Sequence, residues 1–222
     1  ENSKWIGMET EDALSVGTDS LKILAADSDG REDLDSLIED ITDAVITGLA
    51  DYCRKSGIKQ IVLGLSGGID SAVAACVACA AVGPGNVLGI AMPSRFSSQH
   101  SLDDAKYTAE ALGMEFKIQP IDEMHSALEG QITEVLDNGN PVASENIQSR
   151  LRGIIVMAHA NAQSRMAIAT GNKSELAQGY CTLYGDMAGG YTPLGDLYKM
   201  QVYALAEIFN QRAKQNGLQP PV

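Results

Sequence analysis

The sequence lacks the features of several protein classes. It has no run of about 18 apolar residues, so we expect no transmembrane helix. It has no basic segment followed by an apolar core, so no signal peptide is visible. It holds only four cysteines, which do not indicate a disulfide scaffold. Cys76 and Cys79 form a CxxC pair without a second pair, and we expect core residues rather than a zinc or redox site. The expected location is cytoplasmic, with no membrane partner.

Basic residues are also scarce. Lys and Arg number 16 against 29 Asp and Glu, which gives a formal net charge of −13. A nucleic-acid partner would normally meet a basic surface, so tRNA and DNA are disfavoured as substrates. The hydrophobic content of 45% is that of a globular chain. A chain of 222 residues is long enough for one well-buried domain with a tail.

The chain begins without Met and divides by composition into two parts. Residues 1–31 are acidic and rich in Gly, Ser and Asp, which indicates an extension or linker before a domain over residues 32–222. Apolar residues at three- and four-residue spacing predict a helix over 32–55. Strands are expected at 60–65, 87–92, 115–119 and 165–169, and further helices at 69–82, 101–112, 121–137, 144–163 and 196–215. This alternation predicts an α/β fold with a doubly wound parallel sheet and helices on both faces.

The most informative segment is SGGIDS, residues 66–71, which lies between an apolar run and an alanine-rich segment. That order predicts a strand, a tight glycine turn and a helix N-terminus, whose unpaired amides attract an anion. Gly67 and Gly68 allow the backbone to approach a phosphate closely. Asp70 would repel a phosphate unless a cation lay between them, which indicates pyrophosphate held with Mg²⁺. No Lys follows the glycines, so this is not the GxxxxGK[ST] loop.

Polar segments follow three of the predicted strands, at residues 66–71, 93–95 and 170–175. Parallel α/β sheets bind ligands at the carboxyl ends of their strands, so we expect the site at this rim. Glu175 is either a second metal ligand beside Asp70 or a carboxylate that only favours the helix dipole. Thr170 either contacts the nucleotide or only begins a helix.

Three more polar side chains have an ordinary and a functional interpretation. Asn146 and Arg150 are four residues apart and lie on one helix face, which is either solvated or part of a site. Lys199 lies near a helix start, where a cation is mildly unfavourable and an anionic partner would help. Arg95 could bind phosphate or only water.

The SGGIDS string resembles the pyrophosphate loop of the N-type ATP pyrophosphatases, which split ATP into AMP and pyrophosphate to adenylate an acid or amide. Over about residues 32–215 the chain is similar to the NAD synthetases, and in particular to the synthetase domain of their glutamine-dependent branch. The similar segments are MPSRFSSQ (92–99), ENIQSRLRG (145–153), TGNKSELAQGYCTLYGDM (170–187), GDLYK (195–199) and VYALA (202–206). The implied fold is adenine nucleotide alpha hydrolase-like, a Rossmann-like arrangement.

The resemblance implies a reaction and its residues. The carboxylate of deamido-NAD attacks the α-phosphorus of ATP, pyrophosphate leaves, and ammonia displaces AMP to give NAD. Asp70 and Glu175 would hold Mg²⁺, and Asp70 and Lys199 would be the catalytic residues. ATP would be bound by Gly64, Leu65, Ser66, Gly67, Gly68, Ile69, Asp70, Ser71, Arg95 and Thr170. Deamido-NAD would be bound by Asn146, Arg150, Glu175 and Asp186.

Two departures from the family qualify this interpretation. Glutamine-dependent members carry an upstream glutaminase domain, and nothing before residue 32 could encode one, so the chain is either a fragment or uses free ammonia. The family also continues beyond Pro220 and Pro221, so we expect truncation at the C-terminus. A homodimer is implied, because the deamido-NAD site of the family crosses a dimer interface. The alternatives are another N-type enzyme, such as a GMP synthetase or a tRNA-thiolating ATPase, and a non-catalytic nucleotide-binding module.

Overall fold

The structure is a computed structural model and describes residues 30–137, 139–140 and 142–222. Residues 42–222 group into one unit, which contains the sheet and the site. The boundary predicted at residue 32 stays a prediction, because residues 1–29 lie outside the described part. The elements are α2 (Gly30–Ser56), β1 (Ile61–Gly64), α3 (Ile69–Val82), the 3₁₀ helix η2 (Pro84–Asn86), β2 (Val87–Ala91), α4 (Gln99–Leu112), β3 (Glu115–Ile118), α5 (Asp122–Gln131), α6 (Thr133–Asp137), α7 (Val142–Gln163), β4 (Met166–Ala167), α8 (Lys173–Gln178) and α9 (Lys199–Gln215).

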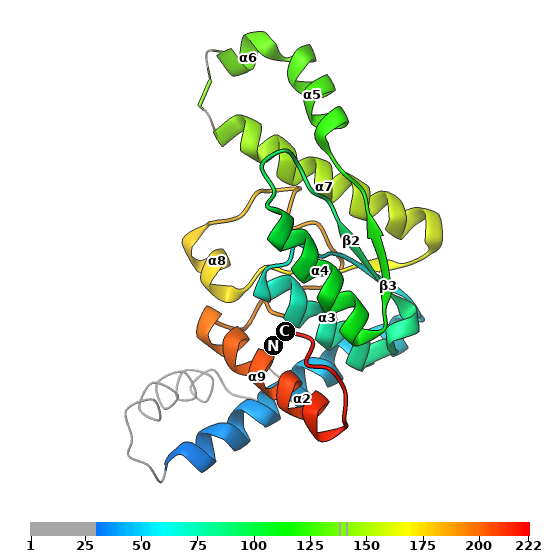
Figure 1. Cartoon of the computed structure of the whole chain (residues 1–222). Coiled ribbons are helices and arrows are strands. Elements are labelled where there is room, and N and C mark those ends of the chain that lie inside the picture. The colour runs from blue at the N-terminus through cyan, green and yellow to red at the C-terminus, as the bar shows by residue number, and fades with distance from the viewer. Residues whose placement is uncertain (1–29, 138, 141) are drawn as a thin grey trace, which may run out of the picture. The chain divides into compact units, whose positions relative to one another are not determined.

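The four strands form one parallel sheet in the order β3-β2-β1-β4 (Figure 1). Parallel neighbours need crossover connections, which α3, α4 and the α5–α7 segment supply. The chain winds outward from β1 to β3 and then returns to the other side of β1 for β4. The strand order therefore reverses between β1 and β4, and their carboxyl ends are where a ligand crevice is expected.

Helices cover both faces of the sheet, as the strand and helix alternation predicts. On one face Val62, Leu88 and Ile90 form a buried cluster with Ile155 and Val156 of α7. Because side chains alternate along a strand, the residues between them point to the opposite face. There α3 packs on β1 and β2, and α4 packs on β2 and β3. The predicted doubly wound α/β fold is confirmed.

The alanine-rich helix α3 is the most buried helix of the sheet layer. Every residue from Ser71 to Cys79 is buried, because small side chains let α3 lie between the sheet and α9. Cys76 and Cys79 belong to this core. Burial raises the pKa of the Cys79 thiol to about 12 and that of Cys76 further. The two cysteines of the CxxC pair are therefore core residues, and their thiols are poor nucleophiles.

Three predicted elements are either interrupted in the structure or three residues shorter there. The segment 121–137 is two helices, α5 and α6, which meet at Ile132 because its backbone leaves the helical range (φ −123°, ψ 25°). The run 165–169 forms a strand only over two residues, since the amide of Ala169 bonds to the Tyr191 carbonyl and Ile168 bridges to Tyr191. The last helix starts at Lys199, three residues later than predicted.

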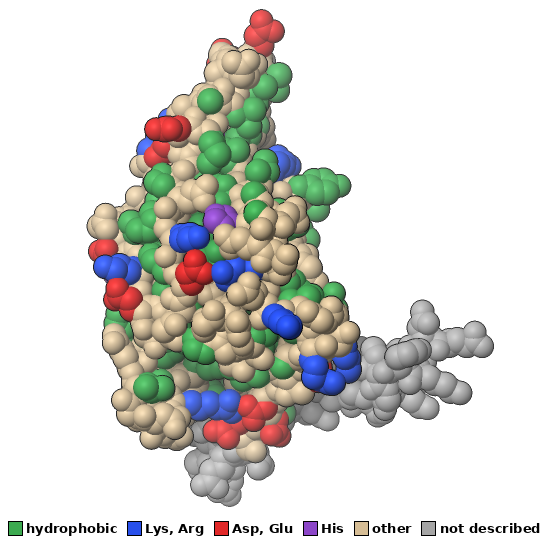
Figure 2. All heavy atoms as spheres, turned by 90° about the vertical axis from the view of Figure 1, so that its right-hand side faces the viewer, with side chains coloured by type: hydrophobic (Ala, Val, Ile, Leu, Met, Phe, Trp, Pro, Cys, Tyr) green, Lys and Arg blue, Asp and Glu red, His purple; other side chains and the backbone are tan. Residues whose placement is uncertain are grey.

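The described helices include none that is both long and apolar enough to cross a membrane. On the face in Figure 2, basic side chains lie beside acidic ones, with hydrophobic side chains exposed between them. The excess of acidic residues over the whole chain therefore does not produce a uniformly acidic surface on that face.

Candidate functional site

The glycine loop joins β1 to α3 at the carboxyl end of the sheet. Gly67 has a φ of +81°, and a Cβ at this position would lie 2.0 Å from the carbonyl oxygen of Ser101 in α4. The Ser71 hydroxyl donates to the Gly68 carbonyl at 2.9 Å and accepts from the Ser66 amide at 3.1 Å. These bonds fix the turn. Gly68 provides no side-chain cap for α3, so the first amides of the helix remain available to an anion.

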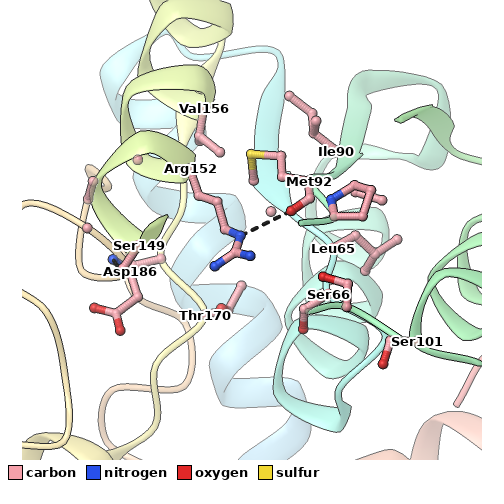
Figure 3. A pocket seen from close by; sticks show the side chains of 18 of the residues that line it. Leu65, Ser66, Ile90, Met92, Ser101, Ser149, Arg152, Val156, Thr170 and Asp186 are labelled. Atoms are coloured by element: carbon pink, nitrogen blue, oxygen red, sulfur yellow. Dashed lines mark hydrogen bonds between the residues drawn. The ribbon is translucent and has the colours of Figure 1, made fainter. Parts of the chain in front are cut away.

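Two cavities lie at this rim. The larger, of about 480 Å³, is bounded by the ends of β1 and β2, by α7 and by the residues after β4 (Figure 3). Apolar side chains such as Leu65, Ile90 and Val156 make up much of its wall. The smaller, of about 200 Å³, lies over the start of α3 and contains both Asp70 and Glu175. The two cavities share Ser66, Ala169, Thr170 and Asp186.

Asp70 is the point where three helices converge. It lies in the first turn of α3, and its Oδ1 accepts a hydrogen bond of 2.9 Å from Nδ2 of Asn172, the N-cap of α8. Its Oδ2 forms an ion pair with Nζ of Lys199, the first residue of α9. The structure thus brings together the two residues that the sequence singled out as catalytic, which are 129 positions apart.

Glu175 is tied to the same asparagine. Its amide donates to Asn172 Oδ1 at 3.1 Å, and its Oε2 accepts from the Asn172 amide at 3.0 Å, which is a capping box. Asn172 is fully buried and so fixes the carboxylates of Asp70 and Glu175 on one cavity wall. Among the described residues no group of three or more His, Cys, Asp or Glu could hold a metal. Two carboxylates still fit Mg²⁺, which takes one or two from the protein and completes its shell with phosphates and water.

The residues predicted for the dinucleotide line up along α7 and the segment that faces it. Asn146 Oδ1 accepts from Oγ1 of Thr182 at 2.8 Å, and Arg150 Nε donates to the Leu183 carbonyl at 3.2 Å. Asp186 Oδ1 accepts from the Thr182 amide at 2.8 Å. Asn146 and Arg150 therefore both bond to the segment 182–186, and Arg150 does so while remaining exposed to solvent.

Glycines allow this segment to lie against α7. A Cβ at Gly185 would come within 2.3 Å of the Ser149 hydroxyl, and one at Gly153 would lie 2.9 Å from the Gly185 carbonyl oxygen. The amide of Asp186 donates to Ser149 at 3.0 Å. Close backbone packing thereby places Asp186 on the wall that the two cavities share.

Arg95 is exposed to solvent, and its side chain is bound outside the two cavities. Several other candidates also line neither cavity, but the guanidinium of Arg95 pairs with Glu129 at 3.1 Å and lies 5.1 Å from the ring centre of Phe96. A hydrogen bond from Ser144 lowers the pKa of Glu129, which keeps this partner of Arg95 ionised. A role for Arg95 in binding ATP stays a prediction.

Two site residues were missed from the sequence. Asn172 could have been found, because Asn followed three positions later by Glu is a capping-box pattern. Arg152 lines the larger cavity and lies one turn before Val156, a buried member of the α7 face that packs on the sheet. Helical spacing from that apolar face would have placed Arg152 toward the sheet rim.

Comparison with known proteins identifies the family of the chain. Residues 41–218 match a protein-family model described as NAD synthase. The glutamine-dependent NAD(+) synthetase of Rhodobacter capsulatus is 55% identical over 161 residues, which are 72% of this chain and 29% of that protein. The enzyme of the same name from Aquifex aeolicus is 47% identical over 78% of this chain and 30% of its own length. The chain thus spans about a third of the length of these curated relatives.

Solved structures show the same relationship. The glutamine-dependent NAD+ synthetase from Acinetobacter baumannii in complex with ADP matches with a TM-score of 0.80 and 36% identity, over 83% of this chain and 35% of that one. The NH3-dependent NAD synthetase from Campylobacter jejuni matches with a TM-score of 0.71 and 35% identity, over 78% of this chain and 73% of that one. These matches confirm the resemblance predicted from the sequence motifs, and the chain belongs to the NAD synthase family.

Proposed function

We propose that the chain carries out the ATP-dependent amidation of deamido-NAD to NAD through an adenylated carboxylate, with release of AMP and pyrophosphate. The observation that carries this proposal is the convergence of an uncapped helix N-terminus, Asp70 with Lys199, and Glu175 at one end of the sheet. The membership of the chain in the NAD synthase family supports the same reaction.

Each part of the site has a task in this reaction. The amides at the start of α3 bind the outer phosphates of ATP, and the apolar wall of the larger cavity accommodates the base. The attacking carboxylate of the substrate is already ionised, so no protein nucleophile or general base is needed. Acceleration comes from alignment and from neutralising charge on the phosphates. Lys199 supplies one such positive charge from the start of α9.

The carboxylates of Asp70 and Glu175 are the groups that would hold Mg²⁺. Bound there, the ion would neutralise phosphate charge and favour departure of pyrophosphate. Asp70 already accepts hydrogen bonds on both of its oxygens. Each carboxylate oxygen has a second lone pair, so Asp70 would still be able to contact the ion while Lys199 stays beside it with its ammonium group near the phosphates.

Asn146, Arg150 and Asp186 support a deamido-NAD site beside α7, and we propose that a second copy of the chain completes it. Ile154 on α7 is 62% exposed, and Leu183 and Tyr184 on the facing segment are 63% and 83% exposed. A Cβ at Gly153 would lie 3.0 Å from the Tyr184 carbonyl oxygen, so the backbone of this segment lies beside the part of α7 that carries Ile154. Apolar surface of this kind is typical of an interface.

Sedimentation equilibrium tests the dimer. The chain is expected to sediment as a dimer, and Ile154→Glu as a monomer, because a buried carboxylate without a partner opposes association. Leu218→Glu is the matched control, since Leu218 is equally exposed at 63% but lies after α9. A monomeric parent chain at micromolar concentration would overturn the proposal.

The curated relatives are longer, glutamine-dependent enzymes, and we propose that a glutaminase domain supplies ammonia to this chain or to its full-length form. The chain should be incubated with ATP, Mg²⁺, deamido-NAD and either ammonium or glutamine, with NAD and AMP followed by chromatography. NAD from ammonium alone is the expected result. ATP binding without turnover would favour a non-catalytic module, and no nucleotide binding would overturn the proposal. The cytoplasmic location stays a prediction.

A further inference from the structure

Arg152 projects from α7 into the larger cavity, where Figure 3 shows its guanidinium over Thr170. Its Nε donates to the carbonyl oxygen of Met92, just beyond β2, at 3.1 Å. This bond joins the helix to the end of the strand and fixes the plane of the guanidinium. The side chain is half-buried, and burial lowers the pKa of Arg152 because it removes the cation from water.

The rest of the guanidinium is available to a ligand. In the described part of the chain, Nη1 and Nη2 of Arg152 have no hydrogen-bond or ion-pair partner. Arginine stays protonated even when partly buried, and its two terminal nitrogens match two oxygens of a phosphate or carboxylate. A half-buried cation held in place without an anion is costly, and an anionic ligand would offset that cost.

The charge of the site makes this cation distinctive. Among the described residues that line the two cavities, Arg152 is the only Lys or Arg, whereas Asp70, Glu175 and Asp186 are acidic. Lys199 lies next to the smaller cavity but is paired with Asp70. A polyanionic nucleotide entering this site would therefore meet Arg152 as its one unpaired cation among the lining residues.

The position along the nucleotide follows from the two cavities. The apolar wall suits a base, and the glycine loop with Asp70 suits the outer phosphates. Ser66 and Thr170 belong to both cavities, and Arg152 lines the larger cavity together with them (Figure 3). The α-phosphate is the group that joins the nucleoside to the outer phosphates. We propose that Arg152 binds the α-phosphate of the nucleotide, a role that rests on the proposed function.

A series of nucleotides tests this assignment on the full chain. Isothermal titration calorimetry, with EDTA to exclude metal, should compare adenosine, AMP, ADP and ATP on the parent chain and on Arg152→Met. We expect AMP, ADP and ATP each to bind the variant about 30-fold more weakly, because loss of a bidentate charged hydrogen bond typically weakens binding by roughly this factor. Adenosine should bind both proteins equally. Arg152→Lys should recover part of the lost affinity, because lysine restores the positive charge but not the two parallel hydrogen bonds of a guanidinium.

Other patterns would overturn the assignment. A loss that begins only at ADP or ATP would place Arg152 on an outer phosphate, and an equal loss for adenosine would reduce its role to holding the Met92 carbonyl. Unchanged binding of all four ligands would remove Arg152 from the site. Arg54→Met, an exposed arginine of α2 paired with Asp51, matches the change in charge and should behave as the parent. Failure of the parent chain to bind any nucleotide would refute the proposed function itself.

Discussion

Replacement of Asp70 by Asn is expected to lower the rate of NAD formation by about 10³-fold while the chain stays folded. The amide is nearly the same size as the carboxylate, and its oxygen can still accept from Lys199 or Asn172. What it loses is the negative charge, which is needed to hold a divalent cation against the phosphates. The change therefore affects the chemistry of the smaller cavity more than the packing of α3, α8 and α9.

Rates of AMP and NAD formation with ammonium as donor measure this effect, and calorimetry of ATP binding with and without Mg²⁺ assigns its cause. A metal role predicts that Asp70→Asn removes the Mg²⁺-dependent part of ATP affinity. If Asp70 only anchors Lys199, ATP affinity should change equally with and without Mg²⁺. Asp51→Asn provides the control, because Asp51 pairs with Arg54 and Lys55 on the surface of α2. Turnover of Asp70→Asn close to that of the parent would refute the assignment.

The elements of the sheet could be predicted because their signals are local. Apolar runs between helical patterns predict β1 and β2, and an alternation of polar and apolar residues predicts β3, each to within two residues at each end. The fourth strand was predicted too long, because the residues that shorten it lie near Tyr191 and are not neighbours in sequence. The break between α5 and α6 has only a weak local signal, a Thr whose hydroxyl bonds to the carbonyl of Glu129.

The sequence was sufficient to predict several residues of the candidate site, but not which of their side chains contact one another. The motifs located Asp70, Glu175 and Lys199, and the structure brings Asp70 together with both of the others. That Asn172 joins the two carboxylates, and that Arg95 pairs with Glu129, depends on contacts between distant segments. Arg152 was overlooked because a charged residue on a helix is usually solvated, although its spacing from Val156 places it on the side of α7 that faces the sheet; its hydrogen bond to Met92 confirms that position.

Gly67→Ala is expected to destabilise the chain by about 3 kcal/mol or more and to abolish nucleotide binding. Two costs combine. A φ of +81° is strained for any residue with a Cβ, by roughly 1 kcal/mol. The new Cβ would also lie 2.0 Å from the backbone oxygen of Ser101, and no change of rotamer can relieve a clash with backbone. Either α4 or the loop must move, and the amides that bind phosphate move with the loop.

Urea denaturation of Gly67→Ala beside Gly57→Ala separates these two costs. Gly57 also has a positive φ, +70°, but a Cβ there would have no neighbour within 4 Å. It should therefore lose only the backbone contribution, about 1 kcal/mol, and bind ATP as the parent does. Equal losses of stability in the two variants would mean that the loop and α4 separate at little cost. The glycine would then be needed for its backbone angle and not for the close approach of α4.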